Sequence, residues 1–153
     1  MIACVTRLRS IQQSGVVVID DGYRLVGEYR HKTSLTPPNG VGDKFLKWML
    51  QHTGTSRVEQ VKLNETVPDS NCFVEFPDPE LEPLFDAPDR KFAAVAHAHP
   101  DKPQILQAAD CKWLDWWPAL RATGVEVDFL CPIDACSFYR KKFPKNPVPR
   151  LPD

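Results

Sequence analysis

Apolar residues recur along this chain in two patterns, one with the period of a helix and one with the length of a buried strand. Over residues 2–13 they return about every third position, which is close to the spacing that places side chains on one face of a helix. Residues 16–19 are a continuous β-branched run, and such runs favour a strand buried on both faces. The aspartates and glycine at 20–22 then predict a turn that caps the next helix.

The same alternation continues to the C-terminal third. It predicts a short helix over 23–29 that ends before Pro37 and Pro38, a helix over 42–52, a strand over 57–63, a helix over 88–97, a strand over 104–108, a helix over 112–123 and a strand over 125–130. Pro118 either begins the 112–123 helix or kinks it. The acidic, proline-rich residues 64–83 predict a long loop with about one helical turn.

This order of elements predicts the fold class. Strands that alternate with helices at this spacing are typical of an α/β fold, with a mostly parallel central sheet and helices on both faces. With 153 residues the chain has the length of one domain. Residues 133–153 are rich in proline and lysine, so we expect a C-terminal tail that is irregular at its far end.

Composition narrows the class of protein further. Apolar residues make up 42% and charged residues 25%, with a net charge of -1, so no basic field attracts nucleic acid over a distance. A bound metal would supply its own positive charge. No run of about 18 apolar residues predicts a membrane span, and we expect a cytoplasmic protein.

The five cysteines point to a reducing compartment. They are odd in number, scattered and without a CxxC pair, which is unlike a disulfide framework. Cys131 and Cys136 have four residues between them, as a zinc pair can. No second pair follows them, so a four-ligand structural zinc site is disfavoured.

Carboxylates lie where a parallel sheet places its ligands. Asp20 and Asp21 end one apolar run and Asp110 ends another, and ligands of open α/β sheets lie beyond the carboxyl ends of the strands. Glu28 and Asp89 are the other candidates. Mg²⁺ and Mn²⁺ prefer such oxygen ligands, so we expect one of these ions there, with Asp86 and Asp115 behind the three main ligands Glu28, Asp89 and Asp110.

Four segments, taken in order, resemble a bacterial PIN-like group of the PIN-domain nuclease superfamily. They are VIDDGYRLVGEY at 18–29, GVGDKFLKW at 40–48, DRKFAAVA at 89–96 and VDFLCP at 127–132. The resemblance covers residues 1–132 and implies a three-layer PIN-like fold. It also implies a hydrolase, a Mg²⁺- or Mn²⁺-dependent endoribonuclease that cleaves single-stranded RNA, related to toxin–antitoxin systems. An antitoxin protein and a homodimer are then the expected partners.

The resemblance also assigns roles to individual residues. Glu28, Asp89 and Asp110 would be the catalytic metal ligands, and Arg90, Lys91 and Lys112 would contact the RNA backbone. PIN-like domains begin with a strand that ends in an aspartate, ahead of the helix at 2–13. The sequence as given starts with that helix, so we expect a PIN-like domain that is incomplete at its N-terminus.

Two other hypotheses compete with the nuclease. In the first hypothesis the chain is a degenerate PIN-like module that binds RNA or a protein partner without catalysis. In the second it is an unrelated α/β domain. In the second case Asp89 and Asp110 only cap helices, and Glu28 is a surface charge. The tryptophans at 113, 116 and 117 predict core packing more than base stacking, and the basic residues 140–145 predict a solvated tail more than a phosphate grip.

Overall fold

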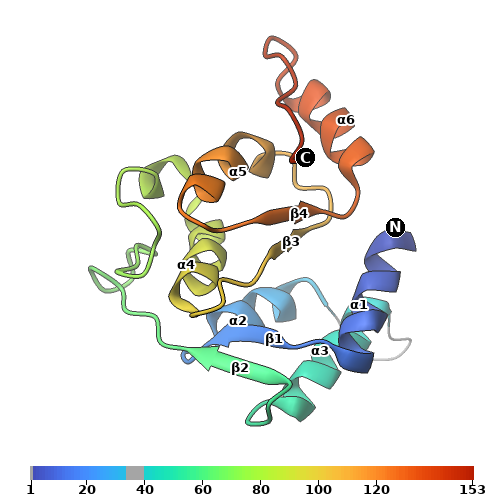
Figure 1. Cartoon of the computed structure of the whole chain (residues 1–153), viewed down its shortest axis with the longest axis vertical. Coiled ribbons are helices and arrows are strands. Elements are labelled where there is room, and N and C mark those ends of the chain that lie inside the picture. The colour runs from blue at the N-terminus through green and yellow to red at the C-terminus, as the bar shows by residue number, and fades with distance from the viewer. Residues whose placement is uncertain (1, 34–39) are drawn as a thin grey trace.

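The computed structural model describes residues 2–33 and 40–153. Its helices are α1 (Ile2–Ser14), α2 (Arg24–His31), α3 (Val41–His52), α4 (Arg90–Ala98), α5 (Trp113–Ala122) and α6 (Pro132–Lys142) (Figure 1). Its strands are β1 (Val17–Asp20), β2 (Val58–Val61), β3 (Ile105–Gln107) and β4 (Val127–Phe129), and the 3-10 turns η1 (Glu82–Leu84) and η2 (Ala87–Asp89) precede α4. The helix stop expected at Pro37 and Pro38 lies outside the described residues.

The elements predicted from the sequence are present, with ends shifted by a few residues. Pro118 lies inside α5, so it does not begin that helix. One helix was not predicted, because α6 occupies the first half of the tail expected at 133–153. Its sequence fits a helix start, since Pro132 occupies the first turn, where its missing N–H costs nothing. The segment is irregular only beyond Lys142.

A buried aspartate sets the start of α2. Both carboxylate oxygens of Asp20 accept backbone N–H groups, from Arg24 at 2.9 Å and from Leu25 at 3.0 Å. The Asp20 side chain is 0% exposed and also lies 3.4 Å from the Arg24 guanidinium. The turn at 20–22 therefore caps the next helix as the sequence predicts, and it fixes how α2 leaves β1.

The strands form two separate pairs. β1 pairs with β2 and β3 with β4, both in parallel, as two two-stranded sheets. The parallel strand direction predicted from the sequence is right, and the four strands are not joined into one hydrogen-bonded sheet. Periodicity identifies strands but says nothing about which of them are neighbours, and β1 and β3 do not hydrogen-bond to each other.

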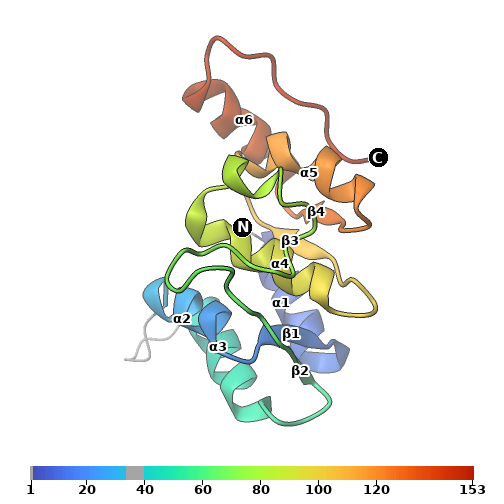
Figure 2. The same cartoon turned by 90° about the vertical axis from the view of Figure 1, so that its left-hand side faces the viewer.

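β1 and β3 are the inner strands of the two pairs in both Figure 1 and Figure 2. The bond from Val17 N to Arg57 O (3.0 Å) directs alternate peptide groups of β1 toward β2. The peptide N–H of Val18 therefore points to the inner edge. On β3 the bond from Ile105 N to Glu126 O (2.9 Å) likewise directs Ile105 toward β4. The peptide N–H of Leu106 therefore points to the inner edge, as that of Val18 does.

Packing joins the two pairs where hydrogen bonds do not. Helix α4 contacts both β1 and β3, and its buried side chains are small, namely Ala93, Ala94, Val95 and Ala96. A second part of the core is aromatic, because the ring of Phe85 stacks on Trp116 at 4.3 Å and meets Trp113 edge-on at 5.8 Å. The prediction that the tryptophans pack in the core is confirmed, since all three are at least 91% buried.

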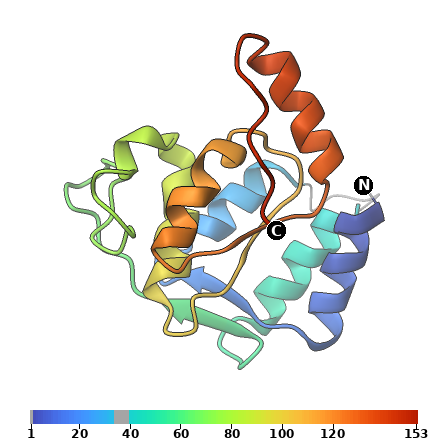
Figure 3. The same cartoon turned by 45° about the horizontal axis from the view of Figure 1, so that its top comes forward.

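The C-terminal segment runs back from the end of α6 to α5 (Figure 3). There the indole Nε1 of Trp117 donates to the carbonyl of Arg150 at 2.9 Å. Arg121 also pairs with Asp153 at 3.2 Å. These contacts make residues 143–153 a strap across α5. In the part of the chain that the structure describes, no helix combines the length and apolar character needed to cross a membrane.

Candidate functional site

Three segments that are distant in sequence bring acidic side chains together. Glu28 comes from α2, Asp89 ends η2 directly before α4, and Asp110 lies between β3 and α5. Burial is the main cause that raises the pKa of Asp89 to about 6, and the negative charges of Asp110, Asp86 and Glu28 add to it. Asp110, Asp86 and Glu28 thus lie within electrostatic range of Asp89, and we call these four residues the acidic cluster.

Lysines neutralise part of this acidic cluster. The Nζ of Lys91 donates to Glu28 at 3.0 Å, and both side chains are largely buried, at 12% and 21% exposure. Lys32 lies 3.4 Å from the same carboxylate. The hydrogen bond from Lys91 is the main cause that lowers the pKa of Glu28, so Glu28 is held as an anion by lysine.

Lys112 is a further lysine that pairs with the acidic cluster. Its Nζ pairs with the carboxylate of Asp86, and that hydrogen bond raises the pKa of Lys112. Its backbone N–H donates to Asp110 Oδ1 at 3.1 Å, which is a cap-type contact just before α5. Asp89 makes no side-chain cap at α4, so helix capping does not account for Asp89, whereas Asp110 accepts this turn bond before α5.

The donor chemistry suits Mg²⁺ or Mn²⁺, whereas the arrangement does not. Carboxylate oxygens are the ligands these ions prefer. Within residues 2–33 and 40–153, however, no three Asp, Glu, His or Cys side chains lie close enough together to hold one ion. Glu28 and Asp86 already have lysine partners, so the predicted ligand set Glu28, Asp89 and Asp110 does not fit a shared ion as the side chains stand.

The basic residues expected to contact RNA are engaged inside the molecule. Besides Lys91 and Lys112, Arg90 donates from Nε to the carbonyl of Phe85 at 3.3 Å and from Nη1 to the sulfur of Cys72 at 3.4 Å. A different set is exposed at the end of α6 and just after it, namely Arg140, Lys141, Lys142 and Lys145. Among the described residues, no carboxylate forms an ion pair with these four side chains. We call them the α6 basic patch.

Sequence reasoning gave one member of the site too small a role and missed another. It placed Asp86 behind the main ligands, whereas Asp86 pairs with Lys112 and raises the pKa of Asp89. It did not consider Lys32, although the spacing of four residues from Glu28 on a helix was the available signal. Two histidines near the end of α4 bond to glutamates, with His97 Nδ1 3.0 Å from the Glu75 carbonyl and His99 Nε2 2.5 Å from a Glu59 oxygen.

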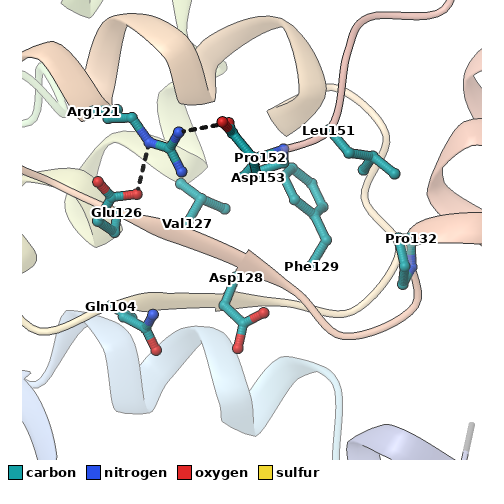
Figure 4. A pocket seen from close by; sticks show the side chains of 10 residues that line it. All are labelled: Gln104, Arg121, Glu126, Val127, Asp128, Phe129, Pro132, Leu151, Pro152 and Asp153. Atoms are coloured by element: carbon teal, nitrogen blue, oxygen red, sulfur yellow. Dashed lines mark hydrogen bonds and ion pairs between the residues drawn. The ribbon is translucent and has the colours of Figure 1, made fainter.

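A hollow of about 480 Å³ lies elsewhere, between β4 and the strap (Figure 4). On its rim Arg121 binds Glu126 at 3.0 Å and Asp153 at 3.2 Å. Asp128 also lines it and pairs with Arg7 of α1 at 2.5 Å. None of the residues of the acidic cluster lines this hollow, and its charged side chains largely satisfy one another.

Comparison with known proteins assigns no family. No family model, no curated protein and no solved structure matches this chain. The resemblance to PIN-like domains therefore stays a hypothesis.

Proposed function

We propose that this chain is a PIN-like module that binds single-stranded RNA through the α6 basic patch, without metal-dependent cleavage at the acidic cluster. The observation that carries the proposal is the pairing of Glu28 with Lys91 at 3.0 Å. The lysines beside the acidic cluster form ion pairs with its carboxylates. They are therefore poor candidates for phosphate contacts. The three-layer PIN-like arrangement belongs to the same proposal.

Charge and exposure support the α6 basic patch as the RNA contact. Arg140, Lys141, Lys142 and Lys145 are all exposed, and Phe138 beside them is 46% exposed. Cations along a strand neutralise phosphates, and an exposed aromatic ring gives a base a surface to stack on. The buried tryptophans at 113, 116 and 117 are unsuited to that second role.

The test measures binding of a fluorescent single-stranded oligouridylate at several salt concentrations. Replacing Lys141→Glu and Lys142→Glu should weaken binding at least ~10-fold and lower the magnitude of the salt slope by about 1.4, since each lost phosphate contact on a single strand contributes about 0.7. The control is Lys44→Glu with Lys47→Glu, which changes the net charge equally on exposed positions of α3. Equal losses in both variants would show that only overall charge matters and would contradict the proposal.

One observation favours the alternative, a Mg²⁺- or Mn²⁺-dependent ribonuclease. The pKa of Asp89 is raised to about 6, in part by Asp110, Asp86 and Glu28, and a bound cation would relieve this repulsion. RNA cleavage that requires Mn²⁺ and disappears in Asp89→Asn would replace the binding proposal with the nuclease. The antitoxin protein and the homodimer stay predictions attached to that alternative.

A further inference from the structure

We infer that Cys4 and Cys131 are a redox-active pair that a small disulfide such as oxidised glutathione converts to an intramolecular disulfide. The sulfur of Cys4 on α1 lies 3.6 Å from the sulfur of Cys131, although the residues are 127 positions apart. This is close to contact for two unbonded sulfurs. Formation of the bond closes the remaining gap to the S–S bond length of about 2.05 Å.

The position of the pair gives the bond a structural effect. Helix α1 has no buried residues, and it packs against α3. Toward the β3–β4 pair it makes the ion pair of Arg7 with Asp128. Cys131 directly precedes α6, and its N–H donates to the carbonyl of Ala108 at 3.0 Å. A disulfide would therefore attach α1 covalently to the β3–β4 half of the molecule.

The chemistry balances as two thiol–disulfide exchanges. The thiolate of Cys4 attacks one sulfur of oxidised glutathione, forms a mixed disulfide and releases one glutathione thiolate. The thiolate of Cys131 then attacks the Cys4 sulfur, forms the internal bond and releases the second glutathione. The protein loses two protons and two electrons, and oxidised glutathione becomes two reduced molecules.

The rate should depend on pH. The pKa of the Cys4 thiol is raised above its ordinary value, first by burial and second by the hydrogen bond with Cys131. Because the thiolate is the nucleophile, oxidation should be faster at about pH 9 than at about pH 7. At the lower pH the pair should stay reduced for longer.

The experiment treats the full reduced chain with oxidised glutathione, blocks the remaining thiols and measures the intact mass, the cross-linked peptides and the Tm. We expect a loss of two hydrogens, a Cys4–Cys131 peptide, and a Tm rise of roughly 5 to 15 °C, because a bridge across so long a loop restricts the unfolded chain. The double variant Cys72→Ser with Cys136→Ser should behave like the parent chain. Cys4→Ser and Cys131→Ser should each abolish the bridge and the Tm rise.

Three results would overturn the inference. They are a bridge mapped to another pair such as Cys131–Cys136, a glutathione adduct that persists on Cys4, and a bridge that leaves Tm unchanged. Each readout is independent of RNA binding, so failure here and failure of the proposed function are distinguishable. The Tm of Cys4→Ser and Cys131→Ser before oxidation shows whether each variant is folded.

Discussion

At Asp89, burial and neighbouring negative charge both disfavour the ionised carboxylate. Its carboxyl group has an ordinary pKa of 3.8, which burial and then the carboxylates of Asp110 and Asp86 raise to about 6. The folded state therefore binds the proton more tightly than the unfolded chain. Above pH 6 the ionised Asp89 costs stability, and the cost disappears as the pH falls toward 3.8.

Asp89→Asn should therefore stabilise the protein at neutral pH. We expect a gain of about 1 to 2 kcal/mol in the free energy of unfolding at pH 7.5, after allowance for partial exposure, and no gain near pH 4. Urea unfolding at both values measures it, with Asp101→Asn on an exposed turn as the control. A gain that is the same at both pH values would show that the charge of Asp89 is not the cause.

At the scale of elements, the junction of β1 and α2 depends on one buried side chain. Asp20→Ala removes the acceptor for two backbone N–H groups and leaves Arg24 without this partner. We expect a loss of about 2 to 4 kcal/mol, because one buried and one partly buried donor lose their bonds together. Asp21→Ala, which removes only the bond from Leu63 N, is the matched variant and should cost about 1 kcal/mol in the same urea titration. Equal costs would contradict the capping role of Asp20.

The sequence predicts most elements because their signals are local. Helical spacing places α1 and α3, and the run at 16–19 places β1. α6 was missed because the prolines after Cys131 favour irregular chain, whereas Pro132 stands in the first turn of a helix, where proline is well tolerated. Local signals therefore identify elements well, and they fail where one residue type, such as proline, is compatible with both a helix start and an irregular segment.

The candidate site was predictable in its main acidic members and not in their pairing with lysines. Acidic residues at Glu28, Asp89 and Asp110 follow from the motif order, and the structure brings them within electrostatic range. The bond between Lys91 and Glu28 joins residues 63 positions apart. No periodicity specifies such a contact, so the neutralisation of the acidic cluster becomes visible only in three dimensions.

At the scale of the whole molecule, the two strand pairs share no strand-to-strand hydrogen bonds within the described residues, and α4 packs against both. The amides of Ile19 and Gln107 face their partner strands, whereas those of Val18 and Leu106 face the inner edges. In hydrogen exchange we expect Val18 and Leu106 to exchange at least ~10-fold faster than Ile19 and Gln107. Exchange at similar slow rates would mean that the inner edges are hydrogen-bonded in solution.

The strap over α5 makes the fluorescence of Trp117 sensitive to whether the C-terminal segment is attached. Trp117 donates its indole N–H to Arg150 and lies 4.8 Å from the Arg121 guanidinium. Release of the last few residues would hydrate that indole and move its emission to longer wavelength. Limited carboxypeptidase digestion, followed by fluorescence, would thus record in real time whether the chain end stays attached while the rest of the molecule remains folded.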